Sequence, residues 1–437
     1  MLEEFKYHID YQLPFLRNGK LLIAISGGID SVVLAHLCHR LDFDFALAHC
    51  NFNLRGEESN ADEAFVLELA EHLDVEVFIQ NFDTQSYANA NKRSIQMAAR
   101  ELRYNWFAEL AVQLQFDFVL TAHHADDNLE TFLINFTRGT GLNGLTGIPI
   151  LNDNIARPLL SFSNANIIAY ARDNGITWRE DSSNASRKYL RNKLRHEVVP
   201  ILKTINPQLL DSFQNTLENL NDTADIVEES LNAVAKRAII DIDSTGVSYK
   251  VSEFKKVNNA KAYLFGMFSD FGFTQWQDIV DLLDAESGKQ VLSHSHRLVK
   301  HRETLILTDL PVEAPKTVSI LSTDTVVEIP TGFLHLSKVD TITTDTKSVI
   351  YLDMTTLRFP LAVRVWQEGD TFQPIGMKGK KKVSKYLKDE KLARPVKEQT
   401  LVLTSNNTVV WVLGRRADDR FKVTDQTQQI LKIALTS

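Results

Sequence analysis

The chain has 437 residues, of which 44% are hydrophobic and 24% are charged, and its formal net charge is −8. This composition is typical of a globular protein, and the length exceeds that of one ordinary core, so two or three domains are expected. The acidic balance argues against a protein that coats nucleic acid indiscriminately. Its apolar runs are too short to cross a bilayer and residues 1–6 do not resemble a signal peptide, so we expect no membrane partner and a cytoplasmic location.

The two cysteines, Cys38 and Cys50, are too few for a disulfide framework or a four-cysteine metal site. Both lie in apolar stretches, which predicts buried, unreactive thiols. This cysteine usage favours a reducing compartment.

The first predicted strand, residues 21–25, runs directly into a glycine-rich turn and then into an apolar helix from Val32. The turn reads Ser26-Gly27-Gly28-Ile29-Asp30-Ser31. Backbone N–H groups at such a strand-to-helix turn form an anion site, and phosphate is its usual ligand. The turn lacks the Gly-Lys-[Ser/Thr] ending of a Walker loop and instead resembles the SGGxDS loop of the PP-loop ATP pyrophosphatases. A glycine turn without a ligand is the alternative interpretation.

The following residues alternate between strand and helix patterns as far as residue 139. Strands are predicted at 43–49, 75–79 and 116–122, and helices at 57–73, 94–114 and from about Asp126 to Gly139. This alternation predicts an α/β fold, a Rossmann-like parallel sheet with helices on both faces. Ligands bind such sheets at the carboxyl ends of the strands. The polar clusters that follow these strands should therefore surround one crevice.

The sequence from His123 to Thr131 follows the fourth predicted strand. If a helix starts at Asp126, then Asp127, Glu130 and Thr131 share one face. Carboxylates beside a phosphate loop suit Mg²⁺, which prefers oxygen ligands and keeps several waters, and Asp30 is placed to complete that site. Ordinary capping of the helix N-terminus by acidic residues is the alternative.

Residues 138–147 contain four glycines in ten positions. Such conformational freedom favours close approach of backbone to a ligand or closure over the crevice. A flexible connecting loop is an equally good interpretation.

The composition changes at about residue 206, where prolines precede a long acidic amphipathic helix. We predict a catalytic domain over 1–205 and a mixed helical and β middle domain over 206–345. A small basic α+β domain is predicted over 346–437.

Two basic clusters point to polyanion binding. Arg187, Arg191 and Arg195 would form one stripe on a helix, with Leu190, Leu194 and Val198 on another face, and a row of guanidinium groups matches a row of phosphates. Residues 351–437 hold 16 Lys and Arg against 9 Asp and Glu, and their lysine cluster includes Lys378, Lys380, Lys381 and Lys382. Phe372 and Tyr386 lie near these lysines and could stack RNA bases. Solvated surface is the alternative for both clusters.

Taken together, these pieces resemble one family, the bacterial tRNA(Ile)-lysidine synthetases. The resemblance extends along the whole chain and rests on the segments 26–31, 49–56, 99–104, 123–131, 138–142, 157–160, 178–184, 191–196, 366–370, 376–381 and 411–416. Two positions depart from the family pattern. Phe52 stands where members often carry a histidine, and residues 161–166 replace the charged residues usual at a helix start.

The resemblance implies ATP-dependent joining of L-lysine to C2 of the wobble cytidine in a tRNA(Ile) with a CAU anticodon. The cytidine oxygen is first adenylated with release of pyrophosphate, and the lysine ε-amine then displaces AMP. The lysidine product changes codon reading from AUG to AUA and tRNA identity from Met to Ile. The sequence leaves open whether the enzyme forms a homodimer.

The resemblance also implies roles for the residues singled out above. Asp30, Asp127 and Glu130 are the candidate catalytic residues, with Mg²⁺ on Asp30 and Asp127 and with either Asp127 or Glu130 as the base or lysine-orienting group. The ATP-binding set is Ser26, Gly27, Gly28, Ile29, Asp30, Ser31, His49, Arg103, His123, Arg138 and Gly139. The tRNA- or phosphate-binding set is Arg187, Arg191, Arg195, Lys378, Lys380, Lys381 and Lys382.

Three other functions compete with this hypothesis. A PP-loop tRNA thiolase would need reactive or cluster-binding cysteines, and Cys38 and Cys50 form no pair. An amidotransferase-like synthetase acting on a small metabolite would have little use for a basic terminal domain. A tRNA-binding protein without catalysis would not need Asp30, Asp126, Asp127 and Glu130 together.

Overall fold

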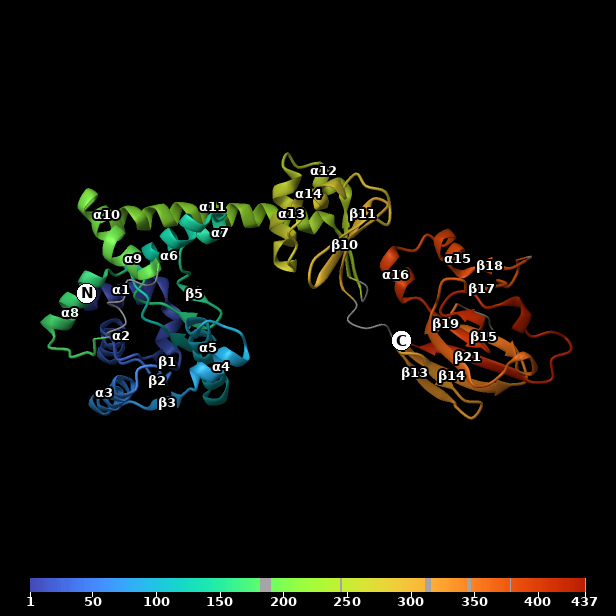
Figure 1. Cartoon of the computed structure of the whole chain (residues 1–437), viewed down its shortest axis with the longest axis horizontal. Helices are drawn as coiled ribbons and strands as arrows, with labels where there is room; N and C mark the ends of the chain where they lie inside the picture. The colour runs from blue at the N-terminus through green and yellow to red at the C-terminus, as the bar shows by residue number, and fades with distance from the viewer. Residues whose placement is uncertain (181–189, 244–245, 311–315, 344–346, 378, 437) are drawn as a thin grey trace. The chain divides into compact units, whose positions relative to one another are not determined.

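The computed structural model describes residues 1–437 except 181–189, 244–245, 311–315, 344–346, 378 and 437 (Figure 1). It divides into two compact units, Met1–Val227 and Glu228–Ser437. Helix α11, Leu209–Ala238, contributes residues to both units. Each unit has its own sheets and hydrophobic core and is described by itself.

The first unit is built on a six-stranded sheet with the strand order β3-β2-β1-β4-β6-β5. Every neighbouring pair is parallel except β5 and β6, which are antiparallel. The chain steps from β1 to β2 and β3 on one side and then returns to β4 on the other, so the crevice beside β1 and β4 is a topological switch point. The strands are β1 Leu21–Ala24, β2 Phe45–Asn51, β3 Val77–Asn81, β4 Phe118–Leu120, β5 Leu151–Asn152 and β6 Ile155–Ala156.

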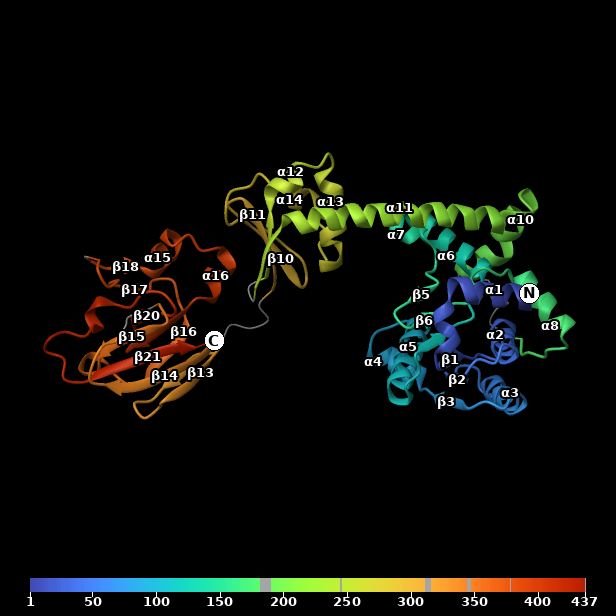
Figure 2. The same cartoon turned by 180° about the vertical axis from the view of Figure 1, so that it is seen from behind.

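Helices cover both faces of this sheet, as the sequence predicts. Leu21 and Ile23 of β1 pack into one core with residues of α2, α3 and α8, whereas Leu22 packs into a second core with α5. Figures 1 and 2 show α2 and α5 on opposite sides of β1. The helices are α1 Leu2–Gln12, α2 Ile29–Arg40, α3 Glu57–Leu73, α4 Thr84–Ala90, α5 Ile95–Leu114, α6 Ala125–Arg138, α7 Leu142–Leu145 and α8 Asn164–Asp173.

Helix α8 begins with a cap although residues 161–166 depart from the family pattern. Ser163 and Asn166 form a capping box in which each side chain accepts a hydrogen bond from the other residue's backbone N–H. An amide oxygen replaces a carboxylate in this role without loss of the cap. The helix therefore begins normally despite the missing charges.

A short helical segment follows α8 and the undescribed residues. It comprises α9, Leu190–Lys193, a π-helical turn at Leu194–Val198, and α10, Val199–Ile205. The predicted apolar face is only partly correct, because Leu194 is buried but Leu190 is exposed. A π-helical turn holds more residues than an α-helical turn, so the predicted i, i+4 spacing is not kept beyond Leu194.

The second unit holds several antiparallel sheets with small helices. One sheet has the order β7-β8-β11-β10-β9 and packs against α12, α13 and α14, and the others are β12-β16-β19-β20, β13-β14-β21-β15 and β17-β18. These agree with the predicted mixed and α+β architecture. Their bounds are β7 Ile239–Asp243, β8 Gly246–Lys250, α12 Val251–Lys255, α13 Ala260–Phe268, α14 Trp276–Asp281, β9 Gln290–Leu292, β10 His296–His301, β11 Thr304–Asp309, β12 Val318–Ile320, β13 Val326–Ile329, β14 Gly332–Val339, β15 Val349–Asp353, β16 Leu361–Val365, β17 Thr371–Phe372, β18 Lys381–Lys382, α15 Val383–Asp389, α16 Arg394–Gln399, β19 Leu401–Ser405, β20 Thr408–Val412 and β21 Ile430–Thr436.

Among the described residues, no helix combines the length and the apolar character needed to span a bilayer.

Candidate active site

The glycine turn after β1 is held in shape by its own serines. The Ser31 hydroxyl donates to the Gly28 carbonyl oxygen at 2.9 Å and lies 3.1 Å from the Ser26 hydroxyl. Gly27 has a φ of +85°, which only glycine adopts easily. Helix α2 begins at Ile29, three residues earlier than predicted, so Asp30 lies in its first turn. The turn therefore presents a preorganised helix N-terminus of the kind that binds phosphate.

The Asp30 carboxyl group has one buried oxygen, Oδ1, without a hydrogen-bond partner. This oxygen lies 3.7 Å from Nε2 of His124. Burial raises the pKa of Asp30, although the nearby His124 and Arg195 oppose that shift. An unpartnered buried carboxylate oxygen is costly unless a ligand or cation satisfies it.

His124 caps helix α6 and faces the phosphate loop. Its Nδ1 accepts the Asp127 backbone N–H at 3.3 Å, and its own backbone N–H donates to Asp127 Oδ2 at 3.2 Å. Because Nδ1 accepts, the proton of the neutral ring sits on Nε2. That N–H is directed toward Asp30 and toward Asp127 Oδ2, which is 3.5 Å away. Asp127 thus caps the helix through Oδ2, as the alternative interpretation expected, and its Oδ1 accepts a hydrogen bond from Arg195 at 2.8 Å.

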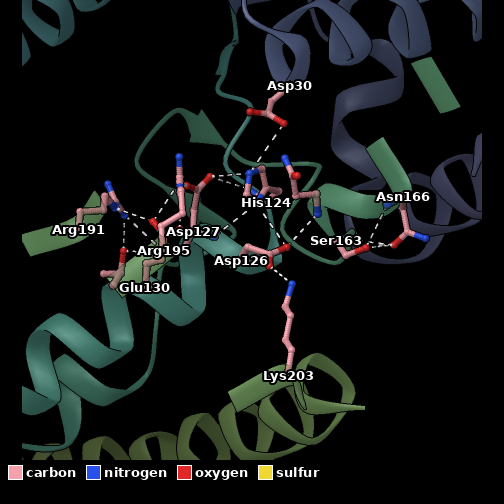
Figure 3. Close-up of polar contacts among 12 residues, drawn as sticks. Asp30, His124, Asp126, Asp127, Glu130, Ser163, Asn166, Arg191, Arg195 and Lys203 are labelled. Carbon is pink, nitrogen blue, oxygen red and sulfur yellow. Dashed lines mark hydrogen bonds and ion pairs between the residues drawn. The ribbon is translucent and has the colours of Figure 1, made fainter. Parts of the chain in front are cut away.

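Two arginines clamp the carboxylates of α6 (Figure 3). Arg195 donates to both oxygens of Glu130 at 2.6 and 3.0 Å and to Asp127 Oδ1 at 2.8 Å. Arg191 donates to the Thr131 hydroxyl at 2.7 Å, and its Nε lies 3.2 Å from Glu130. Glu130 is only 1% exposed, so its charge depends on these guanidinium groups.

The predicted arginine stripe therefore contacts carboxylates in this structure. Arg191 and Arg195 turn toward Glu130 and Asp127, the face that was predicted to bind metal or substrate. Arg187 lies outside the described residues, so its predicted contact stays a prediction. Burial raises the pKa of Asp127, but the neighbouring histidines His124 and His123 and the two arginines outweigh it and lower that pKa below its usual value. Asp127 is thus an anion at any physiological pH.

Of the predicted nucleotide-binding histidines, His49 is buried and His123 is partly buried, and both are neutral. His49 Nδ1 donates to the Ile25 carbonyl oxygen at 2.9 Å, directly before the glycine turn, and burial lowers its pKa. His123 Nδ1 lies 3.0 Å from the Thr121 hydroxyl, and burial lowers its pKa to about 4. Arg103 stands over the ring of Phe52 at 5.2 Å. The aromatic ring at the family's histidine position thus supports a cation.

Arg138 and Gly139 are not brought to this cluster. They stand at the far end of α6, about 16 Å along the helix axis from Asp127. The glycine-rich loop that follows is tied to α6, because Asn128 Oδ1 accepts the Ile148 N–H at 2.7 Å and Asn135 donates to the Gly144 carbonyl oxygen at 2.9 Å. The loop is thus attached to α6 by hydrogen bonds, and its approach to a ligand stays a prediction.

The carboxylates could hold a magnesium ion together with substrate phosphates. Asp30 offers an unused buried oxygen, and carboxylate oxygens are the ligands that Mg²⁺ prefers. No group of three or more metal-ligating side chains occurs in the described part of the chain. At a phosphate, Mg²⁺ usually takes only one or two carboxylates and keeps several waters.

The C-terminal lysines divide into exposed and paired side chains. Lys380 and Lys382 are exposed, whereas Lys381 forms an ion pair with Asp389 at 2.8 Å. Lys378 lies outside the described residues. The predicted stacking role of Phe372 and Tyr386 is wrong, because both rings are buried and pack against each other with centroids 5.2 Å apart. Both rings belong to a small hydrophobic core with residues of α15, β19 and β20.

The thiols are unreactive, as predicted. Cys38 is buried and Cys50 is partly buried. Burial raises the pKa of Cys50 to about 12 and raises that of Cys38 as well. Neither thiol is ionised at neutral pH, which argues against sulfur-transfer chemistry.

Sequence reasoning missed the roles of His124 and Lys203 in this cluster, and it named Asp126 without finding its partner. The interpretation singled out His123, but its neighbour His124 faces the carboxylates. A capping signal was available, since Asp127 stands three residues after His124 in the position of a capping box. Lys203 pairs with Asp126 across 77 residues, and no local pattern indicates such a contact.

Comparison with known protein families identifies three regions of the chain. A PP-loop domain model matches residues 1–202, a TilS substrate binding domain model matches 242–311, and a TilS substrate C-terminal domain model matches 361–434.

Curated relatives match over nearly the whole chain. A tRNA(Ile)-lysidine synthase of Parabacteroides distasonis is 38% identical over 438 residues, which cover 99% of each chain. The synthase of Bacteroides thetaiotaomicron is 36% identical and covers 97% of each chain. That of Porphyromonas gingivalis is 38% identical over 93% of this chain and 92% of its own.

Proposed function

Because the chain belongs to the tRNA(Ile)-lysidine synthase family, we propose that the crevice beside β1 and β4 joins L-lysine to the wobble cytidine of a CAU-anticodon tRNA(Ile) with ATP. The observation that carries the proposal is that carboxylates from the phosphate loop and from α6 meet at His124. Its Nε2 lies 3.7 Å from Asp30 of the phosphate loop and 3.5 Å from Asp127 of α6. The loop proposed to bind ATP and the carboxylate proposed to contact a cationic amine thus lie in one site.

In the first step, the cytidine O2 attacks the α-phosphorus of ATP and pyrophosphate leaves. The glycine turn, fixed by Ser26 and Ser31, directs backbone N–H groups at the phosphates. A magnesium ion at Asp30 and Asp127 would neutralise charge that builds on the leaving pyrophosphate. The target cytosine has to leave the anticodon stack to reach this crevice.

In the second step, the lysine ε-amine attacks C2 of the adenylated base and AMP leaves with the former O2. Of the two carboxylates predicted to handle the amine, Glu130 has both oxygens engaged by Arg195. Asp127 keeps one oxygen that faces only N–H groups of His124. We therefore assign the contact with the lysine ammonium to Asp127, and to Glu130 the task of holding Arg195.

The assay for this function uses labelled lysine, ATP and a tRNA(Ile) transcript with a CAU anticodon. Label in the RNA together with AMP and pyrophosphate is expected. The same transcript with a GAU anticodon is the matched control and should take up no label. AMP formation that requires a sulfur donor and leaves lysine free would instead indicate a thiolase. A cytoplasmic location follows from the proposed tRNA substrate.

A further inference from the structure

The segment of α9, the π-helical turn and α10 holds helix α6 at two separate places. Arg191 and Arg195 grip the carboxylates of α6, as described above. Two turns further along the same segment, Lys203 reaches the neighbouring carboxylate, Asp126 (Figure 3). The second grip has no role in the chemistry proposed above.

Asp126 joins three parts of the first unit. Its Oδ1 pairs with the Lys203 ammonium, and its Oδ2 accepts the Asn164 backbone N–H at 2.9 Å. Oδ2 also lies 4.0 Å from Nδ1 of His124. Next to it, the Ala125 backbone N–H donates to the Phe162 carbonyl oxygen at 2.9 Å. Asp126 is only 8% exposed, so its charge needs these partners.

We propose that Lys203 is a positioning residue for the reaction and acts through Asp126. Their ion pair fixes the first turn of α6 against α10 and the start of α8. That turn carries both His124 and Asp127, so its position sets how Nε2–H and the Asp127 carboxylate face Asp30. This inference rests on the proposed function, because it concerns the geometry of the same site.

Loss of the ammonium would leave the Asp126 charge buried with one neutral donor. The first turn of α6 would then shift toward solvent to hydrate the carboxylate. Displacements near 1 Å in a catalytic arrangement can lower rates by about a hundredfold, and a partial loosening by about tenfold. The phosphate loop rests on β1 and α2, so ATP binding should be little affected.

The test compares Lys203→Met with Lys6→Met, an exposed lysine on α1. For Lys203→Met we expect kcat for lysidine formation to fall about tenfold, while the KM for ATP stays within about twofold. Lys203→Arg should recover most of the rate, because a guanidinium group can also pair with Asp126. Lys6→Met should behave like the unsubstituted protein. A Lys203→Met enzyme with unchanged kcat, or with kcat and KM altered equally, would overturn the inference.

A double-substitution cycle keeps the test independent of folding defects. Asp126→Asn retains the size of the side chain and an acceptor for Asn164, so it should fold and show the same loss of kcat. Asp126→Asn combined with Lys203→Met should be no slower than either alone, whereas additive losses would overturn the inference. If the unsubstituted enzyme transfers no lysine, the proposed function itself fails. If it transfers lysine and the variants match it, only the role of Lys203 fails.

Discussion

His124 links the stability of a helix end to the geometry of the site. Its Nδ1 is committed to the backbone of α6, which fixes the position of the ring proton on Nε2. That proton lies between two carboxylates that would otherwise repel each other. One side chain therefore caps the helix and holds two acidic groups in register. The sequence pattern that singled out His123 gave no sign that His124 would contact both carboxylates.

Asp30→Asn should abolish the adenylation step. The substitution removes the negative charge but keeps the shape of the side chain. Its effect therefore reports the contribution of that charge to stabilising the reacting phosphates. We expect pyrophosphate release to fall at least about a hundredfold, with tRNA affinity nearly unchanged. Pyrophosphate release and filter binding measure the two quantities. Asp44→Asn, an exposed position in the loop before β2, is the control. Full turnover in Asp30→Asn would refute the assignment of Asp30.

Arg195→Gln distinguishes a carboxylate clamp from a phosphate clamp. If Arg195 serves Glu130 and Asp127, as its contacts indicate, kcat should fall at least about tenfold. The slope of log Kd for tRNA against log salt should stay constant. If Arg195 instead contacts a tRNA phosphate, the magnitude of that slope should fall by about one unit. Arg172→Gln, exposed on α8, serves as the matched arginine control.

Among the elements, the glycine-rich loop after α6 depends most on glycine at one position. Gly147 has a φ of +78°, and a Cβ there would stand 2.5 Å from Asn128 Oδ1, the acceptor that holds the loop. Gly147→Ala should destabilise the protein by about 1–3 kcal/mol and lower activity with it. Chemical denaturation and the lysine-transfer assay give the two readouts.

Substitutions at two other glycines of the same loop distinguish backbone strain from a clash with Asn128. Gly139 has a φ of +74° but no neighbour within 4 Å, so alanine should cost about 1 kcal/mol through backbone strain alone. Gly141 has an ordinary negative φ of −81° and open space, so alanine there should be neutral. Equal effects at all three positions would contradict the proposed contact with Asn128.

The packing of α2 against α3 should make stability depend on pH. Burial, together with the charges of His72 and Arg40, lowers the pKa of His36 from 6.5 to about 4. Between these values the unfolded chain binds a proton that the folded chain does not. The stabilisation is fully present above pH 6.5, and the free energy of unfolding should fall by about 1 kcal/mol per pH unit below it, less than the full linkage value because His36 is only half-buried.

Urea unfolding at pH 5, 6 and 7 measures this dependence. His36→Gln should flatten it by about 1 kcal/mol per pH unit, because the residue no longer titrates. His39→Gln, at an exposed position of the same helix, should weaken the dependence only slightly, because His39 contributes less to the pKa shift of His36 than burial does. A His36→Gln protein with the pH dependence of the unsubstituted chain would show that His36 is not buried in neutral form.

The elements of the first unit were largely predictable because each carries its own local signal. The helix at Glu57–Leu73 was predicted at its observed bounds, and Ser94 and Gly139 mark real helix ends. The side-chain clamp of Arg195 on Glu130 was not predictable, since it joins residues 65 positions apart. The exposure of Leu190 also escaped prediction, because apolar spacing does not show where along a helix the contact with the core begins. Local patterns thus place the site, and tertiary packing decides which partners meet in it.

At the scale of the whole molecule, charge is distributed unevenly between the parts of the chain. Residues 351–437 carry 16 basic against 9 acidic side chains, a balance of +7, which leaves −15 for the remainder. A long anionic substrate is therefore attracted to one region and repelled elsewhere, so the basic region favours a bound orientation. Within that region, only side chains without a neutralising partner can release counterions from RNA.

Exposed and paired lysines of this region should therefore differ in their effect on tRNA binding. Lys380→Gln combined with Lys382→Gln removes two exposed charges, so tRNA affinity should fall and the salt slope should weaken by about two units. Catalytic turnover at saturating tRNA should not change, because these lysines are not placed in the reaction site. Lys381→Gln is the matched control from the same run, since Asp389 already neutralises its charge at 2.8 Å. The measurement is the Kd for tRNA between about 50 and 200 mM salt. If this basic loop does not contact tRNA, the double variant and Lys381→Gln should both keep the salt slope of the unsubstituted enzyme.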